Sequence, residues 1–272
     1  HVIEKGLAMP NMRLGFGKAV INDLIMHCIL YASKFDSEKE QFVYALRVIK
    51  EYKLEHEKHN YKLQKSLLKS IDNLLSKNIS LIPSKQIVMT KKNYFKFNQS
   101  SFEDFSNSRK SLRNFSGIVD VEIIKKAVSL AQNAPSACNR QPSRVYVVQE
   151  KDRIEKVLKV QTGNRGFGHL ANKLIILTAE SGGFFGLNER NDVFVNGGIY
   201  AMNLLHALHY YQIGACPLNW CSMPEQDLEL RKICNILPSE AVIMLIACGG
   251  VPEEFKLVTS HRDDSSNILK VI

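Results

Sequence analysis

The first hundred residues carry apolar side chains at helical spacing, separated by charged and amide residues. Such spacing places the apolar side chains on one face of a helix, and the first pattern predicts a helix over about residues 17–32. A second pattern begins at Ser37, a candidate N-cap with Glu40 three residues later, and runs to about Lys77. Its apolar positions are Phe42, Val43, Leu46, Ile49, Leu54, Leu63, Leu67, Leu68, Ile71, Leu74 and Leu75. They become sparse in the polar stretch EHEKHNY, which is compatible with a break between two helices.

Two histidines lie in this polar stretch, His56 and His59, three residues apart. No acidic partner completes a metal-binding signature there, so we interpret both as side chains of a solvated helix. No metal site is predicted elsewhere in the chain.

The pattern changes after about residue 108. Residues 78–108, with Pro83 and the polar run FNQSSFEDFSNS, are interpreted as a linker. Beyond it, runs typical of strands occur at 144–149, 173–179, 214–218 and 241–248. Helical patterns alternate with them at 121–133, 151–160, 192–212 and 225–236. The chain therefore divides into a helical N-terminal extension, residues 1–100, and a mixed α/β domain, residues 101–272.

The predicted helix over residues 192–212 is apolar on more than one face. Its apolar residues are Val193, Phe194, Val195, Ile199, Tyr200, Met202, Leu204, Leu205 and Leu208. A helix that is apolar nearly all round must be deeply buried or covered at an interface. We therefore expect a homodimer.

The net charge of +9 belongs to the front of the chain. Residues 1–100 contain 17 Lys and Arg against 9 Asp and Glu, whereas the rest of the chain is nearly balanced. A basic segment suits nucleic acid, an anionic membrane surface or an acidic partner, but it also suits a solvated lysine-rich helix. Aromatic residues are not interleaved with these lysines, so nucleic acid is not expected. The apolar stretch AVINDLIMHCILYA is too short and too polar to span a bilayer.

The six cysteines show no C-x-x-C spacing, and most of them lie inside apolar runs. They are therefore interpreted as reduced, buried thiols of a protein from a reducing compartment, which predicts a cytoplasmic location.

Hydrolase and nucleotide-binding motifs are absent from the sequence. It contains no G-x-S-x-G, no H-E-x-x-H and no Walker lysine, and the run TGNRGFG lacks the context of a dinucleotide-binding fingerprint. The chain is therefore not expected to be a hydrolase.

Four separate segments carry the candidate chemistry. SRKSLRNFSG concentrates cations and a hydroxyl, which suit a phosphate because charge-assisted hydrogen bonds are the strong ones. NAPSACNRQPSRVYVV offers amide donors and acceptors to the edge of a heterocycle, although an ordinary turn between a helix and a strand has the same composition. GACPLNW can cover a flat ring, and CGGVPEEFKLVTSHR ends in a further cation, Arg262.

In this order and spacing, RKSLR and APSACNRQP make residues 106–270 resemble the FMN-dependent nitroreductase family. The resemblance implies an α+β fold with a central mixed or antiparallel sheet flanked by helices, and FMN bound without a covalent bond at a homodimer interface. It further implies that NAD(P)H reduces the FMN and that a nitroaromatic, a quinone or another small acceptor reoxidises it in a ping-pong cycle. The flavin carries the reactivity, so no catalytic side chain is predicted.

The resemblance also assigns cofactor-binding residues. Contacts to the phosphate, the ribityl chain and the pyrimidine side fall to Arg109, Lys110, Ser111 and Arg113. Contacts bordering the isoalloxazine, partly from the other subunit, fall to Pro135, Ser136, Ala137, Asn139 and Gln141. Asn164 matches a position that bonds the flavin ring, and the segment facing N5 is Pro217, Leu218 and Asn219. The closing phosphate contacts are Ser260 and Arg262.

The chain departs from the family pattern in three places. Ser143 stands where many members have an aromatic residue, and Ser260 where many have a lysine. The opening HVIEKGLAMPNMRLGFG resembles a segment found ahead of nitroreductase-like domains in bacterial polysaccharide gene clusters. Two alternatives stay open: an FMN-binding protein of this fold without turnover, and a basic helical interaction module in residues 1–100.

Overall fold

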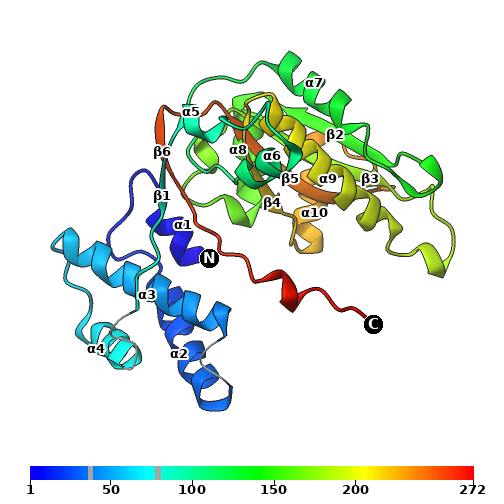
Figure 1. The fold of residues 1–272 in the computed structure, drawn as a ribbon. Coiled ribbons are helices and arrows are strands. Elements are labelled where there is room, and N and C mark those ends of the chain that lie inside the picture. Colours follow the sequence, from blue (N-terminus) through cyan, green and yellow to red (C-terminus); the bar gives the residue numbers. More distant parts are fainter. Residues whose placement is uncertain (36–38, 77–80) are drawn as a thin grey trace. The chain divides into compact units, whose positions relative to one another are not determined.

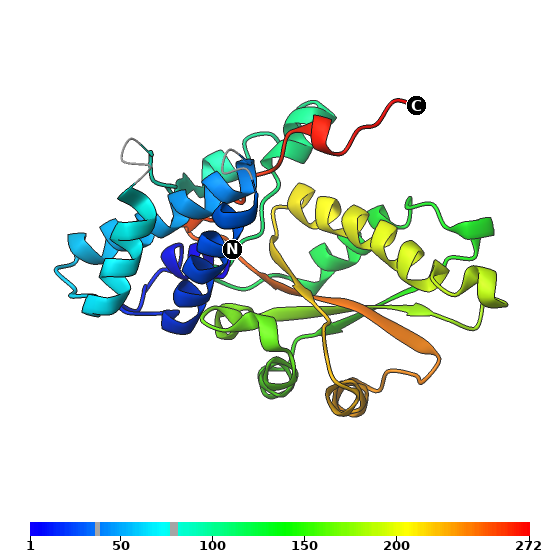
Figure 2. The same ribbon diagram turned by 90° about the horizontal axis from the view of Figure 1, so that it is seen from below.

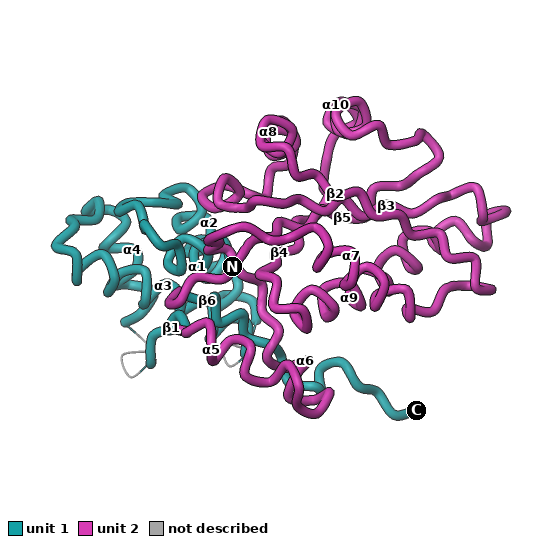
Figure 3. The backbone as a smooth tube through the Cα atoms, turned by 90° about the horizontal axis from the view of Figure 1, so that it is seen from above, with its two compact units in different colours: residues 1–88, 256–272 teal, residues 89–255 magenta. Residues whose placement is uncertain are grey.

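The computed structural model describes residues 1–35, 39–76 and 81–272, which form two units (Figures 1 and 3). Unit 1 comprises residues 1–88 and 256–272, and unit 2 comprises residues 89–255. The chain leaves unit 1 through strand β1 (Ile87–Thr90) and returns through β6 (Glu254–Leu257), and these two strands pair with each other. This division falls after residue 88, whereas the sequence predicts a boundary after residue 100, and residues 256–272 belong to unit 1.

Unit 1 is built from amphipathic helices that share one core. The helices are α1 (Val2–Leu7), α2 (Lys18–Lys34), α3 (Glu40–Lys58) and α4 (Lys65–Leu75). Their buried apolar residues recur three or four positions apart, and include Ile3, Leu7, Ile21, Ile25, Cys28, Phe42, Leu46, Ile49, Tyr52, Leu67 and Ile71. The predicted first helix and the break between α3 and α4 are confirmed. The candidate N-cap Ser37 and the predicted end at Lys77 lie outside the described residues.

The interpretation of His56 as solvated is wrong, because its side chain is completely buried. The backbone N–H of Gly15 donates to His56 Nε2 at 2.9 Å, and His56 Nδ1 lies 2.7 Å from the carbonyl oxygen of Tyr52. Since Nε2 accepts, Nδ1 carries the proton and donates to Tyr52. The His56 imidazole thus accepts a hydrogen bond from the backbone of a distant loop. His59, in contrast, is exposed as predicted.

A four-stranded antiparallel sheet forms the centre of unit 2. Its strands are β2 (Ser143–Val148), β3 (Lys173–Glu180), β4 (Gly214–Asn219) and β5 (Glu240–Gly249), in the order β2-β3-β5-β4. In the register of the central pair, Ile175 lies opposite Ile246. All four strands match predicted ones, and the predicted α+β class, a sheet flanked by helices and preceded by a helical extension, is confirmed.

Helices cover both faces of this sheet (Figure 2). One face carries α7 (Val121–Ala131) and α9 (Asp192–Tyr210), and the other carries α8 (Lys151–Val160) and α10 (Pro224–Cys234). The core under α7 and α9 contains Ile124, Ala127, Ala131, Ile175, Leu177, Tyr200, Leu204, Leu208 and Ile246. The predicted helices agree with these four to within two residues at each end.

The segment predicted as a linker to the second domain, residues 78–108, does pass from unit 1 to unit 2, but it is not an irregular linker; residues 78–80 lie outside the described part of the chain. The segment contains β1 and two short helices, α5 (Lys91–Tyr94) and α6 (Phe102–Ser108). Side chains cap both helices, since Thr90 accepts from the N–H of Asn93 and Ser101 accepts from the N–H of Asp104. Burial of Tyr94 and Phe95 anchors the segment in unit 2.

Candidate functional site

The cation-rich segment from Arg109 to Arg113 lies beside β4, the edge strand of the sheet. The N–H of Leu112 donates to the carbonyl oxygen of Ala215 at 2.9 Å, and the Leu112 side chain is completely buried. Lys110, Ser111 and Arg113 are partly exposed on either side of this anchor. One buried leucine therefore holds the predicted phosphate contacts at the edge of the sheet.

Buried polar and aromatic side chains fix the start of this segment. The Tyr94 hydroxyl donates to the carbonyl oxygen of Lys110 at 2.5 Å, and the Tyr94 ring meets the His209 ring edge to face. The Ser108 hydroxyl donates to the carbonyl oxygen of Phe105 and lies 3.0 Å from His209 Nε2. Because that hydroxyl proton is already used, Nε2–H donates to Ser108 Oγ. Part of the segment predicted as a linker thus positions the cations.

The positive charge of Arg109 acts on two histidines near the end of α9. Burial, then the charge of Arg109 and the neighbouring His206, lower the pKa of His209 to about 4. Burial and the same guanidinium also lower the pKa of His206. Both imidazoles are therefore neutral at pH 7, and the guanidinium sets a positive potential that favours an anionic group.

Amide side chains join the end of α8 to β4. The Gln161 side-chain amide donates to the carbonyl oxygen of Asn219 at 3.0 Å, and its oxygen accepts from the N–H of Gly163. Asn164 Nδ2 donates to the carbonyl oxygen of Leu158 at 2.8 Å. The loop that contains Asn164 is therefore fixed next to the predicted N5-facing segment.

The same loop approaches Arg113. The Arg113 guanidinium lies 6.0 Å from the centre of the Phe167 ring, and the N–H of Phe167 donates to the carbonyl oxygen of Asn164. The structure thus brings residues 109–113, Asn164 and residues 217–219 into one neighbourhood around β4. Leu218 exposes only 3% of its surface, so it offers a ligand its backbone rather than its side chain.

The loop from Pro135 to Gln141 forms at the start of α9. The N–H of Ala137 donates to Oδ1 of Asn196, a buried residue of α9, at 2.7 Å. Ser136 Oγ accepts from the N–H of Gln141, whose side-chain amide donates to Asn139 Oδ1 at 3.2 Å. These bonds close the loop on itself and tie it to the helix.

The backbone of this loop is strained. Cys138, Asn139 and Gln141 have φ values of 50°, 54° and 49°, a region that side chains other than glycine adopt at a cost. A small cavity of about 160 Å³ lies alongside, lined by Pro135, Ser136 and Gln141 among others. The strain holds polar groups around a hollow, as a ligand-binding loop requires.

Within one chain, the loop from Pro135 to Gln141 and the segment from Arg109 to Arg113 lie near opposite ends of α9. Asn196 binds the loop and His209 contacts Ser108. Thirteen residues at a helical rise of 1.5 Å separate these two contacts by about 20 Å. One chain therefore does not bring the two predicted groups together.

Ser260 and Arg262 belong to unit 1. The N–H of Ser260 donates to Glu4 Oε1 at 3.3 Å, and the Tyr44 hydroxyl donates to the same buried carboxylate. Burial and the Glu4 carboxylate raise the pKa of Tyr44 to about 12. Arg262 donates to the carbonyl oxygen of Ser260 at 2.9 Å, so it is fixed through Ser260, which Glu4 of α1 holds.

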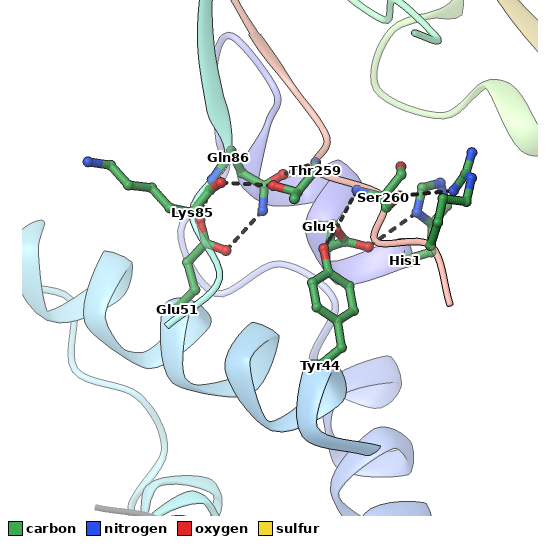
Figure 4. Close-up of polar contacts among 9 residues, drawn as sticks. His1, Glu4, Tyr44, Glu51, Lys85, Gln86, Thr259 and Ser260 are labelled. Atoms are coloured by element: carbon green, nitrogen blue, oxygen red, sulfur yellow. Dashed lines mark hydrogen bonds and ion pairs between the residues drawn. The ribbon is translucent and has the colours of Figure 1, made fainter. Parts of the chain in front are cut away.

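Two further bonds fasten this C-terminal segment. Thr259 Oγ1 donates to the carbonyl oxygen of Lys85 at 2.8 Å, and the N–H of Thr259 donates to the Gln86 side chain (Figure 4). Gln86 in turn donates to Glu51 of α3 at 2.9 Å. The helical extension is thus bound to the C-terminal segment instead of trailing as a charged tail.

Four supporting residues were missed by the sequence analysis: Tyr94, Gln161, Asn196 and His209. Asn196 and His209 are polar residues inside an otherwise apolar helical pattern, and that interruption is a signal that identifies them. No comparable signal marks Tyr94 or Gln161, because their partners are distant in sequence or are backbone atoms.

Comparison with known families supports the resemblance. The model of the nitroreductase family matches residues 107–250. A Clostridium acetobutylicum protein assigned as an NADH oxidase is 26% identical, with a TM-score of 0.51, over 61% of this chain and 98% of that one. An FMN-dependent nitroreductase from Clostridium difficile is 20% identical, with a TM-score of 0.52, over 61% and 96% of the two chains. A Desulfovibrio desulfuricans protein of the same kind, determined in complex with FMN, is 22% identical with a TM-score of 0.52, over 61% and 94%.

No protein of curated function matches the sequence. In the described parts of the chain, no helix is both long and apolar enough to cross a membrane. The solved structures below 25% identity support the fold of this chain, and the match of the family model supports its family.

Proposed function

The chain belongs to the nitroreductase family, and from this premise we propose that it is an FMN-dependent oxidoreductase that passes electrons from NAD(P)H to a small acceptor in a ping-pong cycle. A nitroaromatic, a quinone or another small molecule serves as the acceptor. Bound FMN supplies the hydride and electron transfer, so the protein's task is to bind the cofactor and tune its environment. The observation that carries the proposal is the convergence of residues 109–113, Asn164 and Asn219 around the edge strand β4.

The residues at this edge fit FMN. The charge of Arg109, which lowers the pKa of two histidines, suits the phosphate. The partly exposed Ser111 suits the ribityl hydroxyls, and the amide groups around Asn164 and Asn219 suit the polar rim of the ring. These residues bind and orient the cofactor, and no side-chain acid or base is required.

We also propose that a second copy of the chain completes the site as a homodimer. In one chain the contacts that anchor the loop from Pro135 to Gln141 and the cation segment to α9 lie about 20 Å apart along the helix, so we assign the isoalloxazine contacts of this loop to the partner. The exposed apolar face of α9, which includes Phe194, Val195, Ile199 and Met202, supports burial against that partner.

The cysteines support a reducing compartment. All six are free thiols, and four of them are buried. We therefore propose a cytoplasmic location, where NAD(P)H is available.

A visible spectrum of the purified protein tests the central proposal. We expect bound flavin, released intact by heat or acid, whose visible absorbance bleaches on anaerobic addition of NADH or NADPH. Bound FMN that NAD(P)H does not reduce would favour a binding protein without turnover. A colourless protein with no thermal shift on adding FMN would contradict the proposal.

Removing a phosphate contact tests the assigned residues. We expect Arg113→Ala and Arg262→Ala each to raise the dissociation constant for FMN about 10- to 100-fold, because a hydrogen bond to a charged group contributes about 1.5–3 kcal/mol. Lys126→Ala, an exposed cation of α7, is the matched control. Unchanged affinity in both arginine variants, measured by fluorescence titration, would move the phosphate site elsewhere.

A further inference from the structure

A cavity of about 620 Å³ lies between α8 and the loop that leads into β3. Five residues of α8 line it: Lys151, Ile154, Glu155, Leu158 and Lys159. They recur at positions i, i+3, i+4, i+7 and i+8, so they form one face of the helix. Residues between 164 and 173 supply the opposite wall. The volume is within the usual range for a small-molecule site, about 300–1,000 Å³.

Asn172 brings unsatisfied hydrogen-bonding groups to this wall. Both polar atoms of its side-chain amide are buried, and neither has a hydrogen-bond partner among the described residues. Its backbone N–H donates to the carbonyl oxygen of Cys248 at 3.0 Å, which fixes the residue at the start of β3. Buried amides are nearly always hydrogen-bonded, and leaving one unpaired is unfavourable. A ligand with a hydrogen-bonding polar end would remove that cost.

The charges around the cavity are predominantly positive. Lys173 exposes only 9% of its surface, and its side chain makes no hydrogen bond or ion pair with any described residue. Lys151 and Lys159 also line the cavity without an ion pair to a described residue, whereas Glu155 is the single carboxylate among the lining residues. Three lysines against one carboxylate give the lining a positive potential. This excess of positive charge favours an anionic ligand.

Apolar side chains form the rest of the wall. Ile154 is buried and Leu158 is half-buried, and the exposed Ile118, from the segment before α7, lies at the rim of the cavity. We propose that this cavity binds a small organic anion, namely a carboxylate attached to an apolar body about the size of a fused ring pair. The carboxylate accepts hydrogen bonds from the lysines and, once the Asn172 side chain turns towards it, from Asn172 Nδ2, and the body packs on α8.

This site is distinct from the proposed flavin site, although Asn164 lines it. The Asn164 Nδ2 atom already donates to the carbonyl oxygen of Leu158, so it is committed to the end of α8. None of the other predicted cofactor contacts lines the cavity. Both ligands can therefore be bound at the same time.

Calorimetry with matched probes tests the proposal. The probes are 1-naphthaleneacetate and its uncharged analogue 1-naphthaleneacetamide, titrated into the full chain with and without saturating FMN. We expect 1:1 binding of the acetate at least about ten-fold tighter than the amide, since one charge-assisted contact contributes that much. FMN should leave both affinities unchanged, so the result stands even if the protein has no reductase activity.

Three variants assign the binding to the cavity. Lys173→Met should weaken the acetate about ten-fold and leave the amide unchanged. Leu158→Trp should fill the cavity and abolish binding of both probes while the FMN content stays normal. Lys156→Met, an exposed residue of α8 that does not line the cavity, is the control for changes in helix charge.

Several outcomes would overturn the proposal: no binding at millimolar acetate, equal affinity for both probes, or displacement of the acetate by FMN. Binding that survives Leu158→Trp would place the probe elsewhere. Thermal melting of each variant shows whether it is folded, and if Lys173→Met is not, the double variant Lys151→Met/Lys159→Met provides the charge test.

Discussion

Helices α8 and α9 cover opposite faces of one sheet but differ on the sides that face away from it. The outer side of α8 is polar, with Asp152, Arg153 and Lys156 exposed. The outer side of α9 is apolar, and Phe194 and Ile199 expose 56% and 42% of their surfaces. Both helices need an apolar inner face to cover the sheet, so only their outer faces differ. A polar outer face suits solvent, whereas an apolar outer face suits burial against another protein surface. Helix α9, which has the apolar outer face, also holds the strained loop from Pro135 to Gln141 through Asn196.

The largest expected effect is a loss of dimer stability when a charge is placed on the apolar outer face of α9. Ile199→Glu should convert a dimer into a monomer, because an unpaired carboxylate buried at an interface costs several kcal/mol. We expect the dissociation constant of the dimer to rise at least about 100-fold.

Sedimentation velocity at micromolar concentration measures this change. Lys156→Glu, on the polar outer face of α8, is the matched control and should leave the sedimentation coefficient unaltered. A wild-type protein that is monomeric with FMN bound would refute the shared-site proposal, and the apolar outer side of α9 would then need another explanation.

The second effect is a pH dependence of the free energy of unfolding, which comes from His209 of α9. The pKa of His209 is about 4 in the folded chain and about 6.5 when unfolded, so the unfolded chain binds the proton more tightly. Stability is therefore complete above pH 6.5 and falls by up to about 3 kcal/mol as the pH drops towards 4.

Urea unfolding at several pH values between 7 and 4 tests this dependence. His209→Gln should flatten the decline relative to wild type, and His27→Gln, an exposed histidine of α2, should not. Equal slopes for His209→Gln and wild type would show that the imidazole does not titrate as its burial requires.

The smallest effect concerns the support of the cation segment. Tyr94→Phe removes the hydrogen bond to the carbonyl oxygen of Lys110 and should lower the free energy of unfolding by about 1 kcal/mol. FMN affinity should fall about five-fold as the segment loosens. The control is Tyr211→Phe, because the Tyr211 hydroxyl makes no hydrogen bond to any described residue. If both variants behave alike, Tyr94 acts through its ring alone.

The four strands of the central sheet and the four helices on its faces were predictable because each one is strongly patterned. The apolar run of β3 and the 19 residues of α9 identify themselves within their own sequence. The predicted site residues around β4 also come together, because most of them follow or precede such an element.

The errors have a different origin. Strand β1 has four residues and exists because β6, more than 160 positions later, pairs with it. His56 lies in a polar stretch, and only the N–H of Gly15 explains its burial. Contacts made across long sequence separations leave no periodic pattern, so a window of neighbouring residues does not reveal them. The assignments of Ser260 and Arg262 to the flavin stay predictions for the same reason.

The pairing of β1 with β6 makes unit 2 an insertion within unit 1, and this has a consequence for synthesis on the ribosome. Unit 2 is complete once residue 255 has emerged, whereas Glu4 and Tyr44 receive Ser260 only after residue 260 has emerged. Domains fold as they emerge, at roughly 5–20 residues per second, so the nascent helices of unit 1 wait about ten seconds or more for residues 256–272. Unit 1 is therefore begun before unit 2 and completed after it, and a ribosome stalled just after unit 2 has emerged would carry a folded sheet and a unit 1 that lacks residues 256–272.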